Sequence, residues 1–259
     1  MVTSQADTGP TGYIAIRVWK AVAVTTALLR PRNDLRLYDD LADQWWNPQG
    51  AFAMLHWIAE ARANLVPPAS RPGAVLVDIG CGAGLLAPWL GGKGYTHIGV
   101  DLTGSALAQA QAHGVVVGRG DVASLPLASG VADVVCAGEI LEHVADLAAV
   151  VSEACRVLRP GGTLVIDTIA KTRLADLIAV RLAERVPGGA PVGIHDPALF
   201  VDRGLLVSTC ASYGVALRLR GIRPGVPGLL GWLARRRPAR MVSTWSTAVL
   251  FQAVGIKTP

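Results

Sequence analysis

Long uninterrupted apolar runs are missing from this sequence, although 51% of its 259 residues are hydrophobic. The nearest approach is YIAIRVWKAVAVTTALL over residues 13–29, which Arg17 and Lys20 interrupt. A membrane-spanning helix needs about 18 consecutive apolar residues. The sequence therefore predicts no spanning helix. The first residues are polar and no cleavage pattern follows them, so we also expect no signal peptide and a cytoplasmic protein.

Cysteine is scarce, and the four present have neither the spacing of a metal site nor that of a disulfide framework. They are Cys81, Cys136, Cys155 and Cys210. Small secreted disulfide folds and zinc ribbons are thereby excluded. We expect reduced, buried thiols.

Aromatic stacking motifs are also missing, although the net charge is +5. Cations gather in LARRRPAR (233–240), at Arg218, Arg220 and Arg223, and near the N-terminus. This combination argues against nucleic acid as a partner and favours an anionic surface such as lipid headgroups. The alternative is that a GC-rich genome has simply favoured arginine.

What is present from residue 74 onward is an alternation of short apolar runs and Ala-rich stretches. Strands are predicted at 74–79, 97–102, 115–121, 132–138 and 162–169, and helices at 83–93, 104–113 and 144–158. Continuous apolar strands that alternate with helices indicate a buried parallel sheet with helices on both faces.

Before the sheet, residues 1–12 are expected to lack structure, and helices are expected at 13–30 and at about 38–64. The Pro-rich stretch VPPASRPG (66–73) reads as a linker. We therefore expect an N-terminal helical segment over 1–65, which would act as a lid, and one α/β domain over 66–259.

The first predicted strand leads into a glycine-rich loop, Asp78-Ile-Gly80-Cys81-Gly82-Ala-Gly84. Bare glycines let the backbone turn tightly and let a ligand approach the main chain. Dinucleotide-binding loops space their glycines G-x-G-x-x-G, but the third position here is Leu85. A nicotinamide-dependent oxidoreductase is therefore disfavoured.

The loop resembles the D/E-x-G-x-G-x-G loop of class I S-adenosylmethionine-dependent methyltransferases. GDVASLP, ADVVCAGEILEHV and VLRPGGTLVID resemble later segments of that family, in the same order. The resemblance implies a Rossmann-like α/β fold with a mostly parallel seven-stranded sheet and S-adenosylmethionine as cofactor. The cofactor-binding residues that it implies are Arg62, Asp78, Gly80, Cys81, Gly82, Gly84, Asp101, Leu102, Asp121, Val122 and Gly138.

A closer resemblance is to the O-methyltransferases of ubiquinone biosynthesis, over residues 38 to 205. It is carried by Trp45, Trp46, Gly50, Leu55, His56 and Arg62, by EILEH (139–143), and by Gly193, His195 and Asp196 in GIHD. It implies that Arg62 binds the methionine carboxylate. Three departures, at Ala59-Glu60, at Ala170 and in WSTAVLFQ (245–252), lie where the acceptor or lid would be.

Glu139, Glu142 and His143 would lie on one side of a helix that begins at Glu139. We predict them as catalytic residues, because a phenolic hydroxyl must lose its proton to become a good nucleophile. Two carboxylates and an imidazole also suit Mg²⁺, Mn²⁺ or Zn²⁺, and the resemblance implies a divalent cation at this motif. The alternative is a structural helix start with His143 in the core.

An amphipathic insertion at about 170–200 is expected to contain a helix over 172–189. Its apolar stripe is Leu174, Leu177, Ile178 and Leu182. The stripe would either pack on the core or contact the inner face of a membrane and admit a prenylated acceptor; the resemblance implies membrane contact here.

The sequence as a whole indicates a methyltransferase that acts on a hydroxyl of an aromatic acceptor, of quinone-precursor or polyketide-like type. The alternative is a S-adenosylmethionine-binding subunit of a membrane-associated biosynthetic complex that has no turnover of its own.

Overall fold

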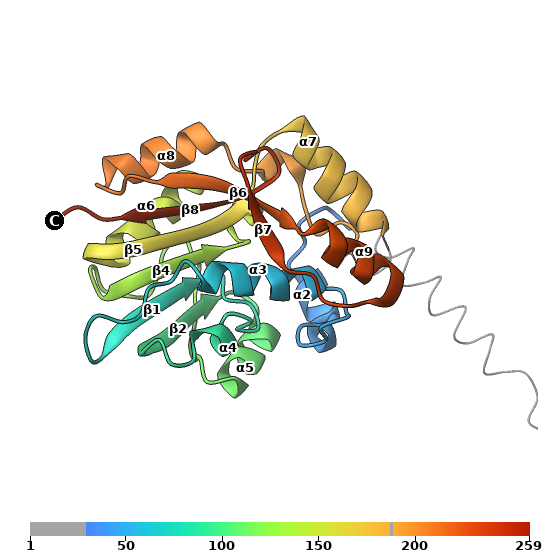
Figure 1. The fold of residues 1–259 in the computed structure, drawn as a ribbon. Coiled ribbons are helices and arrows are strands. Elements are labelled where there is room, and N and C mark those ends of the chain that lie inside the picture. The colour runs from blue at the N-terminus through green and yellow to red at the C-terminus, as the bar shows by residue number, and fades with distance from the viewer. Residues whose placement is uncertain (1–29, 187–188) are drawn as a thin grey trace, which may run out of the picture.

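The computed structural model describes residues 30–186 and 189–259 (Figure 1). The helix expected at 13–30 lies outside the described residues except for Arg30. Among the residues described, no helix is both long and apolar enough to cross a membrane.

One sheet of eight strands organises the described chain, in the order β3-β2-β1-β4-β5-β8-β6-β7. The strands are β1 Ala74–Ile79, β2 Tyr95–Asp101, β3 Val116–Arg119, β4 Ala132–Gly138, β5 Leu158–Ile169, β6 Arg218–Pro224, β7 Met241–Thr244 and β8 Leu250–Ile256. The first five in chain order are parallel, and β8 runs antiparallel to β5. The Rossmann-like prediction is confirmed, and all five predicted strands form. Seven strands were expected and eight are present, because β7 pairs with β6 at the edge of the sheet.

Helices cover both faces of the sheet (Figure 1). They are α2 Arg36–Asp40, η1 Ala42–Gln44, α3 Ala53–Ala63, α4 Ala87–Leu90, α5 Gly104–Ala112, η2 Leu141–His143, α6 Leu147–Val157, α7 Arg173–Ala175, η3 Asp176–Leu182, η4 Ala183–Arg185, η5 Pro197–Leu199, α8 Arg203–Ser212 and α9 Val226–Arg235. Successive residues of a strand point to opposite faces. On β4, Val135 and Ala137 accordingly pack in the cluster that includes α6 and α8, while Val134 and Cys136 pack with α3 and α4. All four cysteines are free and buried, as predicted.

Three expected helices differ from the prediction. Of the helix expected at 83–93, only α4, Ala87–Leu90, is helical. The stretch at 38–64 is broken between η1 and α3, where Asn47, Pro48 and Gly50 form turns. The stretch at 172–189 consists of the short α7, a π-helical η3 and a 3₁₀ turn, η4. Its predicted apolar stripe is exposed, because Ala179 and Val180 form the buried side instead.

The direction of the strands decides where the site lies. β5 and β6 both run antiparallel to β8, so their carboxyl ends lie at the same edge of the sheet as those of the parallel strands. α7 and η3 follow β5 at that edge, and α9 follows β6. In open α/β sheets, ligands bind at the carboxyl ends of the strands.

Candidate active site

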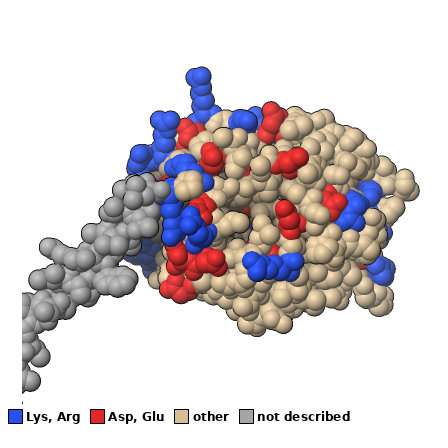
Figure 2. Space-filling view, turned by 180° about the vertical axis from the view of Figure 1, so that it is seen from behind, with Lys and Arg blue, Asp and Glu red and all other residues tan. Residues whose placement is uncertain are grey.

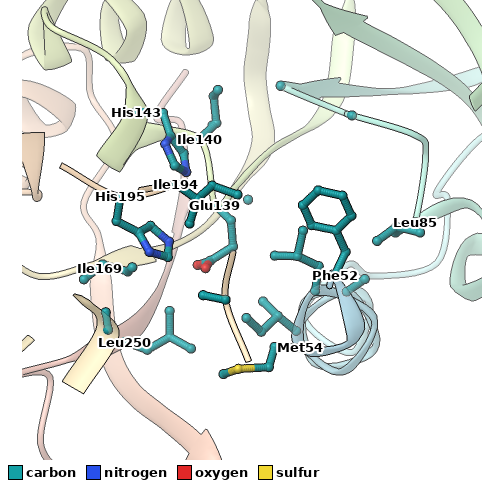
Figure 3. Close-up of a pocket in the computed structure, with 18 of the residues that line it drawn as sticks. Phe52, Met54, Leu85, Glu139, Ile140, His143, Ile169, Ile194, His195 and Leu250 are labelled. Atoms are coloured by element: carbon teal, nitrogen blue, oxygen red, sulfur yellow. The ribbon is translucent and has the colours of Figure 1, made fainter. Parts of the chain in front are cut away.

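A cavity of about 790 Å³ lies at this edge (Figure 3). One end is lined by the glycine loop and by the ends of β2 and β3, and the rest mostly by apolar side chains. The apolar part includes Met54, Ile169, Ile194 and Leu250. Small-molecule sites are commonly apolar cavities of this size with a few placed polar groups.

The glycine loop can be formed only by glycines. Gly80, Gly82 and Gly84 have φ values of 68°, 51° and 79°, which side chains rarely adopt. A Cβ on Gly80 would lie 2.5 Å from Ile140 Cγ1, and one on Gly82 would lie 2.7 Å from Trp45. The loop is therefore fixed between the segment that follows β4 and the N-terminal segment.

Acidic residues lie at or just beyond the ends of the first three strands. Asp78, Asp101 and Asp121 all line the cavity, together with Cys81, Leu102 and Val122. Asp101 accepts hydrogen bonds from the backbone N–H groups of Gly82, at 2.9 Å, and Thr103, at 2.8 Å. Burial raises the pKa of the Asp101 carboxyl. Each of its oxygens keeps a second lone pair that a hydroxyl could use.

Arg62 reaches the same cavity from α3. Its Nε and Nη2 donate to the two oxygens of Asp167 at 2.6 and 2.7 Å, and both side chains are buried. A Cβ on Gly138 would lie 1.7 Å from Arg62 Cζ, so only glycine admits the guanidinium here. The Asp167 pair was not anticipated from the sequence. It leaves the Nη1 donors of Arg62 without a side-chain partner among the described residues.

The two predicted catalytic glutamates point in different directions. Glu139 has a left-handed φ of 53° and lines the cavity, where Figure 3 places its carboxyl group near the centre. Glu142 is fully buried and accepts a hydrogen bond from Thr168 Oγ1 at 2.7 Å. Burial raises the pKa of Glu142 to about 7 and the pKa of Glu139 well above its usual value. Strained backbone at such a position is typical of functional sites.

The predicted three-ligand metal site does not form from these side chains. Within residues 30–186 and 189–259, no three His, Cys, Asp or Glu side chains gather in a way that could hold a metal ion. The physical reason is local. The expected helix does not begin at Glu139, and the three-residue turn η2 directs Glu142 away from the cavity toward Thr168.

His143 lies in the cavity wall and is held by Asn33, which is 110 residues away in the chain. Asn33 Nδ2 donates to the carbonyl oxygen of His143 at 2.8 Å, which fixes the orientation of the amide. Asn33 Oδ1, 2.7 Å from His143 Nδ1, must therefore accept the N–H of the ring. The lone pair is then on Nε2, which has the Tyr38 hydroxyl 3.5 Å away. Burial lowers the pKa of His143 to about 4, so the imidazole is neutral at pH 7.

A second histidine, His195, stacks on His143 with ring centroids 5.6 Å apart. It comes from the predicted insertion, and burial lowers its pKa to about 3. Its segment is held by Glu184, which accepts from Arg32 and from the backbone of Gly193. In the sequence, the GIHD segment included His195 in the resemblance but gave it no role, and Asn33 lay between the two expected N-terminal helices. A cavity-facing role for either residue could not have been inferred from spacing.

The N-terminal segment lies directly against the glycine loop. Trp45 is buried and stacks on Phe52 with centroids 4.2 Å apart. Trp46 Nε1 donates to the carbonyl oxygen of Ala83 at 3.2 Å, and His56 Nε2 lies 2.8 Å from the carbonyl oxygen of Trp45. The residues of the Trp-pair motif thus connect α3 to the loop.

Comparisons with known proteins agree with this geometry. The methyltransferase domain family matches residues 77–166. The ubiquinone biosynthesis O-methyltransferase of Ralstonia nicotianae is 35% identical over 73% of this chain and 84% of its own length. The protein of the same name from Paraburkholderia xenovorans is 36% identical over 73% and 83%.

Solved structures show the same fold at lower identity. A S-adenosylmethionine-dependent methyltransferase from Thermotoga maritima, described as a possible histamine N-methyltransferase, has a TM-score of 0.59 at 18% identity and covers 83% of this chain and 94% of its own. One from Mesorhizobium loti has a TM-score of 0.53 at 20% identity, with 77% and 98% covered.

Proposed function

Since the chain belongs to the family of ubiquinone biosynthesis O-methyltransferases, and is thus a S-adenosylmethionine-dependent methyltransferase, we propose that it methylates a hydroxyl of an aromatic acceptor with an apolar substituent. The observation that carries this proposal is the single cavity that joins the glycine loop to an apolar region containing Glu139 and His143. Quinone precursors have this chemistry.

The cofactor is assigned to the end of the cavity that carries the glycine loop. Asp101 accepts the ribose hydroxyls, Asp121 and Val122 contact the adenine, and Nη1 of Arg62 binds the methionine carboxylate. Of the remaining residues proposed at the cofactor, Asp78, Gly80, Cys81, Gly82, Leu102 and Gly138 line the cavity. Gly84 does not line it and acts through the left-handed turn of the loop.

The transfer itself is a displacement in which the acceptor oxygen attacks the methyl carbon as the carbon–sulfur bond breaks. The enzyme must hold these three atoms in line and remove the hydroxyl proton. We assign the proton to Nε2 of His143, which is neutral and carries the lone pair. Glu139, whose raised pKa favours the protonated form, donates a hydrogen bond to a neighbouring acceptor oxygen. Glu142, which is fully buried and accepts from Thr168, does not contact the acceptor.

The cofactor assignment is tested with Asp101→Ala. We expect at least a 100-fold loss of S-adenosylmethionine affinity by calorimetry with an unchanged circular dichroism spectrum, and no NAD binding by the unmodified protein. Asp202→Ala, at the N-terminus of α8 and outside the cavity, is the control. Unchanged affinity of Asp101→Ala would remove the basis for the assignment.

The acceptor is tested with a series of 4-alkylcatechols, by following S-adenosylhomocysteine formation. We expect KM to fall as the alkyl chain lengthens from methyl to nonyl. A KM that does not depend on chain length would contradict an apolar acceptor. If no product forms from any catechol while the cofactor binds, the alternative of a binding subunit without turnover is favoured.

We further propose that α7 and η3 contact a membrane surface. Leu174 of α7 and Leu177, Ile178 and Leu182 of η3 form one apolar stripe, the η3 stripe, which is 39–53% exposed. Leu177→Glu with Ile178→Glu should release the protein from anionic vesicles in a flotation assay and leave cofactor affinity intact. A core-packed helix would instead misfold on this change. Absence of vesicle binding by the unmodified protein would contradict the proposal.

A further inference from the structure

α9 presents an apolar row to the outside of the molecule. Val226, Leu229, Leu230 and Leu233 are 37–60% exposed. The inward side is occupied by Trp232, which is buried against Trp57 with ring centroids 5.1 Å apart. A surface helix ordinarily presents polar residues to water. The packing of α9 on the protein therefore does not account for its outer row.

The strand that follows α9 continues this apolar surface. Trp245, directly after β7, is 99% exposed, and Val242 on β7 is 39% exposed. An indole is large and apolar with one polar N–H group, and tryptophan is enriched where a membrane meets water. An almost fully exposed tryptophan beside an apolar helix indicates a surface that is covered in use.

Val226, Leu229, Leu230, Leu233, Val242 and Trp245 together form what we call the α9 surface. This surface and the η3 stripe border the same cavity. Ile178 and Ala179 of η3 line the cavity, and so do Pro224 before α9 and Thr244 and Ser246 around Trp245. Figure 1 places α7 and α9 on the same side of the molecule, beyond the carboxyl ends of the strands. An apolar molecule that leaves the cavity between these elements would meet apolar side chains on both sides.

The positive charge of the C-terminal part indicates an anionic partner. Residues 203–259 contain no Asp or Glu, and their cations are Arg203, Arg218, Arg220, Arg223, Arg235, Arg236, Arg237, Arg240 and Lys257. Four of these lie at or just beyond the end of α9. The side chain of Arg240 is 88% exposed, and its Nε lies 4.0 Å from Glu60 Oε1. Arg236 stacks on Trp232. Figure 2, turned by 180° from Figure 1, shows Lys and Arg gathered on the side of the molecule that carries α7 and α9, beside acidic side chains.

We propose that α9 and Trp245 form a second membrane-binding element that, with η3, seats the mouth of the cavity on an anionic bilayer. The leucines enter the acyl region, Trp245 lies at the headgroup level, and Arg235, Arg237 and Arg240 contact the anionic headgroups. An apolar acceptor then passes from bilayer to cavity without crossing water. The inference extends the proposed function, on which it rests for the nature of the molecule that enters.

The test is partition of the full chain onto vesicles of phosphatidylglycerol and phosphatidylcholine, measured by sedimentation. Leu229→Ser with Leu230→Ser and Leu233→Ser should weaken partition at least tenfold. The control is Leu205→Ser on α8, because Leu205 is 48% exposed but lies outside this surface. Cofactor affinity of each variant shows that it has folded. A triple variant that folds and partitions like the unmodified chain would overturn the inference.

Two further measurements separate a bilayer from other partners. Brominated lipids should quench tryptophan fluorescence, and Trp245→Phe should remove most of that quenching. Arg235→Gln with Arg237→Gln and Arg240→Gln should weaken partition onto anionic vesicles several-fold and leave the weaker binding to pure phosphatidylcholine unchanged. If quenching is unchanged in Trp245→Phe, or if the apolar variants alter self-association in place of partition, the surface binds something other than lipid. If only the η3 variant loses partition onto vesicles, the proposed function stands and the role of α9 is refuted.

Discussion

At the scale of single residues, the site depends on side chains that hold other side chains. Asn33 makes no predicted contact with the cofactor, yet its amide fixes which nitrogen of His143 carries the lone pair. Its φ of 61° is left-handed, a conformation that Asn and Asp tolerate better than most residues. Arg62 is held in the same way by Asp167. The guanidinium of Arg62 also lies against Gly138, where no other residue would fit.

We expect Asn33→Leu to lower kcat by about 10²-fold. The reason is that the imidazole of His143 loses the hydrogen bond that fixes its tautomer and its orientation. The dissociation constant of S-adenosylmethionine should not change. Asn33→Asp keeps an acceptor for Nδ1–H and the tolerance for a left-handed φ, so it should recover most of the rate. Steady-state kinetics and calorimetry on the three proteins check this. Equal losses in Asn33→Leu and Asn33→Asp would show that Asn33 acts only on folding.

At the scale of elements, the segment before the sheet is part of the site through its aromatic residues. Trp45 closes over Gly82, and Trp46 stacks on His113 of the α5 terminus with centroids 3.5 Å apart. Trp45, Phe52 and Ala59 share one cluster with Ala83 and Leu85 of the loop region. We therefore retain the prediction that this segment acts as a lid.

Trp45→Ala should destabilise the protein by about 3–5 kcal/mol, the usual cost of removing a buried tryptophan. It should also weaken S-adenosylmethionine binding, because the void lies against the glycine loop. Urea unfolding and calorimetry measure the two effects. Trp89→Ala on α4 is the matched control, since Trp89 is 41% exposed. A Trp45 variant with normal cofactor affinity would separate the segment from cofactor binding.

At the scale of the whole molecule, buried carboxyl groups beside the site connect stability to pH. Glu142 has a pKa of about 7 in the folded protein and about 4.5 when unfolded. The folded state therefore binds the proton more tightly between these values. The stability that this proton contributes is fully present below about pH 4.5 and is lost as pH rises through 7.

Glu142→Gln should remove the part of this loss that Glu142 contributes, about 2–3 kcal/mol at pH 8, and keep an acceptor for Thr168 Oγ1. The loss that comes from Glu139, whose pKa is also raised, should remain. Urea midpoints measured from pH 5 to pH 8.5 check it. Glu153→Gln serves as the control, because Arg156 lowers the pKa of Glu153 and its removal should leave the alkaline loss in place. An unmodified protein whose stability does not fall between pH 5 and 8 would contradict the assignment.

The sequence by itself determined the sheet and the cofactor loop. Strands 74–79 and 132–138 have the predicted bounds, and the glycines of the loop occupy the left-handed positions that only they adopt readily. These features are local, because an apolar run of six or seven residues and a required left-handed φ both depend only on residues that are consecutive in the sequence. The family could be identified for the same reason, because its motifs are short and ordered.

Only the tertiary structure decided what each polar group in the cavity faces. The spacing of Glu139, Glu142 and His143 predicted three ligands on one helix, but a single left-handed residue turned Glu142 into the core beside Thr168. The Asn33–His143 and Arg62–Asp167 contacts join residues more than 100 positions apart. The periodicity of a segment predicts that it has an apolar side and not whether that side meets the core, a membrane or water. That depends on the free energy of packing against elements distant in the chain, which left the η3 stripe and the outer row of α9 exposed.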